Sequence, residues 1–125
     1  MAFSNTVAAN LLNQLFRDDP IYIALYTSNP TAADTGSEVS GGSYARQAIT
    51  FSAPATESGA QTIKNTSEIQ FPVATADWGT VTHVGIRTAA TGGNLLSFGT
   101  LANARTILSG DRFTILIDNA VQRLS

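Results

Sequence analysis

Turn-forming residues divide most of this sequence into short segments of strand-like character. From Ile21 onward, stretches rich in Val, Ile, Leu, Phe, Tyr and Thr alternate with groups of Gly, Pro, Asn, Asp and Ser. Turn signals that recur at intervals of about 8–12 residues are typical of β-sandwiches and jelly rolls, and roughly eight such segments are present here. The pattern predicts a mainly β fold, a β-sandwich or jelly-roll-like domain.

The predicted strands differ in how much of their surface is apolar. Residues 21–27 carry apolar side chains on both faces, which predicts a central strand covered on each side. Gly85 lies in the middle of the predicted strand 80–88, where a glycine indicates a bulge or a close approach to the backbone. Further strands are predicted at residues 44–51, 62–64, 68–71, 95–101, 106–108 and 112–118.

A short helix is predicted ahead of the first strand, within residues 1–19. Apolar residues recur there at spacings of three and four on one helix face, at Val7, Leu11, Leu12, Leu15 and Phe16. Ser4 or Asn5 can cap its start, and Pro20 prevents it from continuing. We expect this helix either to close the end of the sandwich or to dock onto a neighbouring subunit.

The length of 125 residues is the usual size of one domain, so we predict a single β-sandwich domain over residues 1–125. Residues 28–43 and 52–61 break the strand pattern and read as two long polar loops. Loops of this kind are usually functional or flexible. We expect both to act as contact arms that lie across a neighbouring subunit and become ordered only there.

The chain carries few charges, which restricts its partners. Charged residues make up 13% of the sequence, about half of the usual share of roughly 25%. Either the surface is polar without charge, or neighbouring subunits cover part of it. The net charge is −2 and the cationic residues are scattered singly, so we expect no nucleic-acid partner. No apolar run approaches the ~20 residues of a transmembrane helix, so we expect no membrane partner.

No catalytic or ligand-binding pattern stands out in the sequence. His83 is the only histidine, no cysteine is present, and no glycine-flanked serine elbow or phosphate-binding loop occurs. One histidine without cysteine cannot form a zinc site, and the aspartates do not follow the spacing of a calcium loop. We therefore expect no enzymatic activity, no cofactor, no metal and no small-molecule ligand.

Candidate interface residues come from the predicted helix and from aromatic and arginine side chains elsewhere. Trp and Arg are enriched at contact hot spots, although the sequence favours Trp78 as a core or hinge anchor over an interface residue. Tyr44 and Arg46 share one strand face, where an arginine can form a two-pronged bond with a carboxylate such as that of Glu38. The candidate interface set is Leu11, Leu15, Phe16, Tyr44, Arg46 and Trp78.

Several short motifs in a fixed order resemble one family. They are Ile21–Thr27 followed by Asn29–Pro30, Glu38–Val39, Tyr44–Gln47, Ile69–Pro72, Trp78–Ile86 and Gly92–Leu96. This order is similar to that of small proteins encoded in the structural-gene blocks of tailed bacteriophages and prophages, which are often labelled tail fibre or hypothetical structural proteins. The resemblance covers about residues 21–118. It implies a virion protein that is assembled in the cytoplasm of a bacterial host.

Three functions are compatible with these features. The first is a head decoration (cement) protein that binds the capsid exterior as a homo-oligomer, with a trimer as the expected form. The second is a tail, collar or fibre-attachment component. The third is a carbohydrate-binding receptor module that would use Trp78 or Tyr26 as a sugar platform. For the first two, the expected partners are further copies of the chain and other virion proteins, such as the major capsid protein or tail proteins.

Overall fold

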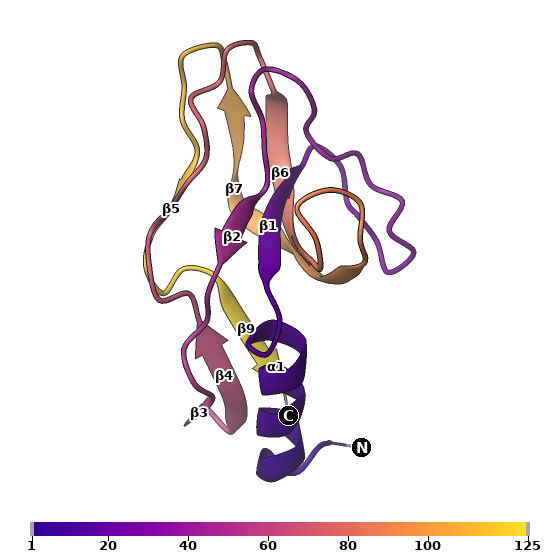
Figure 1. The fold of residues 1–125 in the computed structure, drawn as a ribbon, viewed down its shortest axis with the longest axis vertical. Helices are drawn as coiled ribbons and strands as arrows, with labels where there is room; N and C mark the ends of the chain where they lie inside the picture. The colour runs from indigo at the N-terminus through magenta and orange to yellow at the C-terminus, as the bar shows by residue number, and fades with distance from the viewer. Residues whose placement is uncertain (1, 125) are drawn as a thin grey trace. The chain divides into compact units, whose positions relative to one another are not determined.

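The computed structural model describes residues 2–124 as a mainly β chain with a short N-terminal helix (Figure 1). This confirms the predicted fold class. No helix among the described residues is long and apolar enough to cross a membrane. In chain order the elements are α1 (Asn5–Phe16), β1 (Ile21–Tyr26), β2 (Gln47–Ile49), β3 (Ala55–Glu57), β4 (Ala60–Lys64), β5 (Ile69–Gln70), β6 (Gly79–Arg87), β7 (Leu95–Ile107), β8 (Thr114–Ile115) and β9 (Val121–Leu124).

The chain forms two compact units, and each is built from stretches that are separate in the sequence. Within the described residues, unit 1 comprises residues 2–20, 49–69 and 115–124. Unit 2 comprises residues 21–48 and 70–114. The single domain expected from the length stays a prediction, because interleaved units can still belong to one folding domain.

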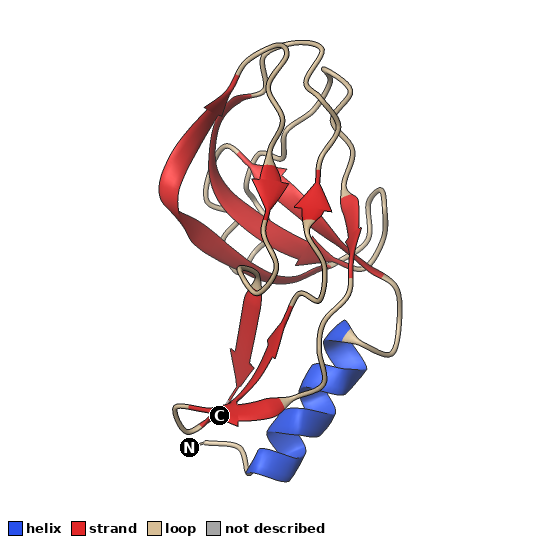
Figure 2. Ribbon diagram, turned by 90° about the vertical axis from the view of Figure 1, so that its left-hand side faces the viewer, coloured by secondary structure: helices blue, strands red, loops and turns tan. Residues whose placement is uncertain are grey.

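Unit 1 is a three-stranded antiparallel sheet, in the order β3-β4-β9, with α1 packed against β4 and β9 (Figure 2). The buried residues of α1 are Ala8, Leu12 and Phe16, which recur every four residues. The Phe16 ring meets the ring of Phe51 edge to face at 5.7 Å. The Ser4 hydroxyl caps the helix by accepting a hydrogen bond from the Val7 N–H at 3.2 Å. The helix therefore covers the sheet of unit 1 with one face, while its two predicted roles, closing the end of a sandwich and docking onto a neighbouring subunit, stay predictions.

Asn65 fixes the C-terminal stretch of unit 1. Its side chain is 1% exposed. Its amide donates to the Ser67 and Leu116 carbonyls at 2.9 and 3.0 Å, and its Oδ1 accepts from the Ala120 N–H at 2.9 Å. These bonds hold the residues that precede β9. The sequence did not predict this strand. The predicted strand 112–118 was too long, because only Thr114–Ile115 pairs, and Leu116 and Ile117 are exposed.

The predicted loop at residues 52–61 is wrong, because most of it is a hairpin. β3 pairs antiparallel with β4, from Ala55 opposite Thr62 to Glu57 opposite Ala60. Ser58 and Gly59 form the turn with φ values of 49° and 81°. All three residues of β3 are exposed, so the strand has no alternation of buried apolar and exposed polar residues by which the sequence could reveal it.

Unit 2 contains a four-stranded antiparallel sheet in the order β2-β1-β6-β7. β1 lies between β2 and β6, and five of its six residues are buried, which confirms its prediction as a central strand. β6 pairs with β1 on one side and with β7 on the other. The predicted strand 44–51 is shorter than expected, since β2 covers only Gln47–Ile49.

β7 replaces the two separate strands predicted at residues 95–101 and 106–108. It is one strand of 13 residues, but its pairing with β6 passes from Thr100 opposite His83 to Arg105 opposite Val81. Residues 101–104 therefore bulge out opposite Thr82 alone. The bulge interrupts the alternation of side chains, and this interruption produced the gap between the two predicted strands.

Candidate assembly site

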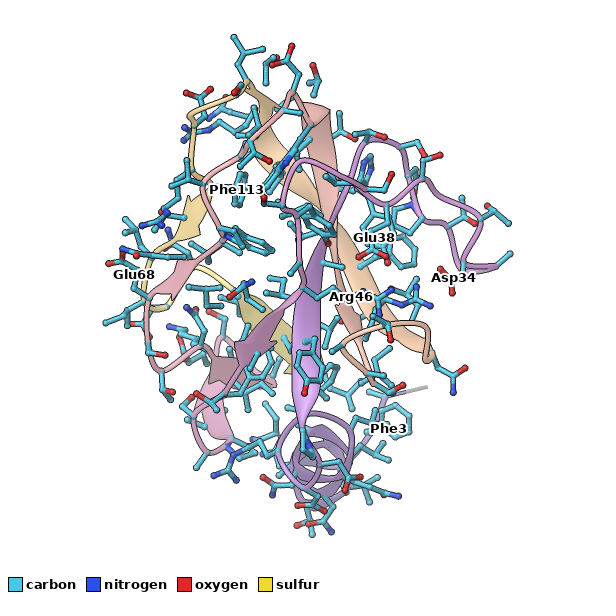
Figure 3. The ribbon with its side chains drawn as sticks, turned by 45° about the horizontal axis from the view of Figure 1, so that its top comes forward. Phe3, Asp34, Glu38, Arg46, Glu68 and Phe113 are labelled. Carbon is cyan, nitrogen blue, oxygen red and sulfur yellow. The ribbon has the colours of Figure 1, made fainter. Side chains whose placement is uncertain are left out.

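Two arginines of unit 2 hold the loop at residues 28–43 and the turn between β6 and β7. Arg46 forms a fork with the Glu38 carboxylate, with its Nε and Nη2 atoms 2.8 and 2.7 Å from the two carboxylate oxygens. Its Nη1 donates to the carbonyls of Ala89 and Gly92 at 2.9 and 2.8 Å. Figure 3 shows Glu38 and Arg46 side by side. The predicted bond between Arg46 and Glu38 is confirmed.

Arg87, at the end of β6, makes a second fork with Asp34. Its Nη1 and Nη2 lie 2.7 and 2.9 Å from the two Asp34 carboxylate oxygens. It also donates to the Tyr26 hydroxyl at 3.0 Å and to the Gly92 and Gly93 carbonyls at 3.2 and 3.0 Å. These bonds use all five N–H groups of the guanidinium. We refer to Arg46, Arg87, Glu38 and Asp34 together as the arginine clamp.

The clamp fixes the protonation of its members near neutral pH. The hydrogen bonds from Arg87 lower the pKa of Asp34 below its ordinary value. Burial acts to raise the pKa of Glu38, but hydrogen bonds from Arg46 and Tyr44 outweigh it and lower that pKa. Burial raises the pKa of both Tyr26 and Tyr44. The carboxylates therefore stay charged and the phenols stay protonated, which suits a permanent structural link.

An aromatic cluster lies next to the clamp within unit 2. The Tyr44 ring stacks on Phe71 at 6.2 Å and meets Trp78 edge to face at 5.4 Å. Phe71 in turn meets Phe113 edge to face at 5.9 Å. The Tyr44 hydroxyl donates to Glu38 at 2.7 Å and accepts from the Leu25 N–H at 3.0 Å. Tyr44 thus connects the core of unit 2 to the clamp.

The loop at residues 28–43 is bound to its own sheet. The N–H groups of Thr27 and Val39 donate to the Ser37 and Leu25 carbonyls at 2.9 and 3.0 Å, and the Ser37 N–H donates to the Ser28 hydroxyl at 2.8 Å. We expected this loop to be ordered only on a neighbouring subunit. The structure instead orders it through contacts within the chain.

The candidate interface residues fall into two groups. Phe16, Tyr44, Arg46 and Trp78 make their contacts inside their own units, and Trp78, at 5% exposed, donates its N–H to the Gly42 carbonyl at 2.9 Å. Leu15 is 42% exposed and Leu11 is half-buried. An interface role stays a prediction for all six residues, and Leu15 is the one among them whose side chain is exposed.

The outer face of α1 forms an apolar stripe. Val7 is 45% exposed, and with Leu11 and Leu15 it recurs every four residues, in a row about 100° around the helix from Ala8, Leu12 and Phe16. Asn5–Phe16 contains no charged residue. The sequence signalled this stripe, because apolar residues occur in adjacent pairs along the helix. It could not show which member of each pair the strands of unit 1 would cover.

The residues considered for chemistry lie apart. No group of three or more His, Asp or Glu side chains that could hold a metal occurs within residues 2–124. His83 is half-buried, and its Nδ1 lies 2.7 Å from the Thr82 hydroxyl. Trp78 and Tyr26, the two aromatic residues considered for sugar binding, are 5% and 1% exposed. Neither offers a ring face for a sugar to stack on.

Comparisons with known proteins give one match. A family model described as "Podophage GP4 fiber I protein gp80" matches residues 2–122 of the chain. No curated protein matches it.

Proposed function

The chain belongs to the family of the Podophage GP4 fiber I protein gp80, and from this premise we propose that it is a non-enzymatic component of a phage tail fibre. Membership of this family makes it a structural protein of a phage virion. The predicted resemblance to virion proteins is confirmed. The fibre location is the finer step, and the family description is the single observation that carries it.

The geometry supports a structural role. The arginine clamp ties the loop at residues 28–43 and the turn at residues 89–93 to the sheet through ion pairs and backbone carbonyls. Such links keep surface loops in one conformation, as a subunit with fixed neighbours requires. The fibre role was the second of the functions that the sequence allowed. Head decoration was the first, and it stays a prediction that the family description does not favour.

We further propose that the chain works as a homo-oligomer in contact with other tail proteins. The support is the low charge of the sequence together with the apolar outer stripe of α1. A surface helix that lacks charge and exposes Val7 and Leu15 is better suited to a protein neighbour than to water.

Locating the protein in intact particles tests the fibre role. Antibodies raised against the purified chain, bound to particles and imaged by electron microscopy, should mark the tail and leave the capsid surface bare. Quantifying the protein against the major capsid protein gives an independent result, because a decoration protein covers the capsid lattice and is far more abundant than a fibre. Labelling of the capsid surface would reject the fibre proposal.

A further inference from the structure

The outer edge of β7 is an open strand edge. β7 pairs with β6 on one side, and no strand of residues 2–124 pairs with it on the other. The residues along such an edge present N–H and C=O groups that another strand can satisfy. Proteins usually block these edges with charged residues or proline. Residues 95–104 contain neither.

Gly99, in the middle of this edge, has no evident function within its own chain. A Cβ built at Gly99 meets no atom within 4 Å, and its φ is not positive. Gly85 differs, because a Cβ there would lie 2.9 Å from the Tyr26 ring. A glycine in a strand weakens it unless another backbone must come close. The neighbouring Phe98 is 43% exposed and Thr100 is exposed.

We propose that residues Ser97–Leu101 pair antiparallel with the same residues of a second copy, centred on Gly99. Gly99 then faces Gly99 of the other copy, and Phe98 faces Thr100 in both directions, as a two-fold interface requires. The inference rests on the proposed function in that both need several copies to assemble. The pairing ends at Leu101, the first residue of the bulge, and its length of about five residues is typical of natural strands.

The second copy's β7 matches this edge better than the chain's other edges do. β2, the opposite edge of the same sheet, has 3 residues, and β3 also has 3. β9 has 4 residues and includes Arg123. Two β7 edges match in length and bring no like charges together, because residues 97–101 carry none. The pairing favours an even number of copies, in contrast to the trimer expected from the sequence.

Charged substitutions on the edge test the pairing in the full-length protein. Gly99→Lys places two lysines opposite each other in the pair, yet the space around position 99 leaves the single chain undisturbed. Phe98→Lys is a second variant at an already exposed side chain, and Val73→Lys is the control, because Val73 is also 43% exposed but lies outside β7. Light scattering after size exclusion should give a dimer for the unchanged protein and Val73→Lys, and monomer for the two edge variants.

Mixing gives a result that a general loss of folding could not produce. Gly99→Lys and Gly99→Glu, each monomeric alone, should form a mixed dimer when combined. An unchanged protein that is monomeric or trimeric, or edge variants that keep their oligomeric state, would overturn the inference. These outcomes are independent of where the protein lies in the particle. If antibodies mark the tail but the edge variants keep their oligomeric state, only the pairing is rejected. If the protein is a dimer but antibodies do not find it in the tail, only the fibre role is rejected.

Discussion

At the scale of single residues, each arginine of the clamp bonds to a carboxylate and to backbone carbonyls at once. The Arg46–Glu38 fork could be predicted, because the two residues are only 8 positions apart and Arg46 lies on a face shared with Tyr44. The Arg87–Asp34 fork could not, since it joins residues 53 positions apart. Asp34 also has a φ of 57°, which sequence patterns do not reveal. Local spacing predicts short-range pairs and is silent on those set by sheet topology.

Arg87→Met should destabilise the protein by about 2 kcal/mol. The substitution removes five hydrogen bonds, and one of them is the bond that Arg87 donates to the hydroxyl of the buried Tyr26. The figure is below that for a fully buried pair, since the Asp34 side chain is 37% exposed. Urea unfolding followed by circular dichroism gives the free energy of unfolding. Lys64→Met is the control, because its pair with Glu57 is exposed and should contribute about 0–1 kcal/mol. Equal losses in both variants would contradict the clamp's role.

The clamp should make the stability of the protein fall at acidic pH. The pKa values of Asp34 and Glu38 are lowered from 3.8 and 4.5, so their contribution to stability is present above pH 4.5 and is lost as the pH falls through the lowered values. The unfolded chain binds protons first, which draws the equilibrium toward it. Thermal melts between pH 7 and pH 3 should show a constant melting temperature down to about pH 5 and then a fall. Asp34→Asn combined with Glu38→Gln should lower the melting temperature at pH 7 and flatten its acid decline.

Gly85→Ala should destabilise the sheet of unit 2 by about 1–3 kcal/mol, the usual cost of overpacking a core. The added Cβ would lie 2.8 Å from the Leu95 side chain and 2.9 Å from the Tyr26 ring, which Arg87 holds in place. Gly99→Ala is a matched control, because it lies on the next strand of the same sheet in open space. Unfolding measured at dilution, where the chain is monomeric, should separate the two. If both substitutions lowered the free energy of unfolding, the loss would come from replacing glycine in a strand and not from a clash of the added Cβ at position 85.

At the scale of elements, the sequence predicts those with strong apolar periodicity and misses the others. α1, β1 and β6 were predicted nearly to their ends, because α1 and β6 repeat apolar residues at their own periods and β1 is apolar on both faces. β3 is exposed throughout and β9 is a short edge strand, so neither has such a pattern. The interior face of α1 was also ambiguous, since the strands of unit 1 select Ala8, Leu12 and Phe16 over their apolar neighbours.

Two leucines of α1 should separate folding from assembly. Leu12→Ala should lower the free energy of unfolding by about 2–5 kcal/mol, because Leu12 is 2% exposed and its loss leaves a cavity. Leu15→Ala, at 42% exposed, should change stability by about 0.5 kcal/mol or less. If the outer stripe contacts a neighbour, Leu15→Ala should weaken incorporation into particles while Leu12→Ala lowers the melting temperature. A stable, fully incorporated Leu15→Ala protein would remove the stripe from the proposed contacts.

At the scale of the whole molecule, the shortage of charge limits the kinds of contact that could hold the proposed oligomer together. Only 13% of the residues are charged, and the arginine clamp already commits four of them within the chain. In the proposed oligomer, specific contacts between copies would then depend on shape, apolar area and backbone hydrogen bonds. The dependence on uncharged contacts could be anticipated from composition alone, whereas the strands and faces that would supply those contacts could not.

Assembly should therefore be nearly insensitive to salt. Raising the salt concentration from 0.1 to 1 M shortens the screening length from about 10 to about 3 Å, which weakens exposed ion pairs but not apolar or backbone contacts. The oligomer measured by light scattering, and the amount bound to particles, should be unchanged over this range. Release by moderate salt alone would show that charged contacts hold the protein in place.

The hydrogen bonds of Asn65 also determine the order in which the two units can form during translation. This residue bonds to Leu116 and Ala120, which lie 51 and 55 positions later, and β4 pairs with β9 beyond them. A ribosome must therefore translate all of unit 2 before unit 1 can close. Unit 2 can fold first on the nascent chain, as domains commonly do. Chains that terminate before residue 116 would lack β9 and the bonds to Asn65, so the helix would have only part of its supporting sheet. Incomplete translation products would then be recognisable to host proteases before they could enter a growing particle.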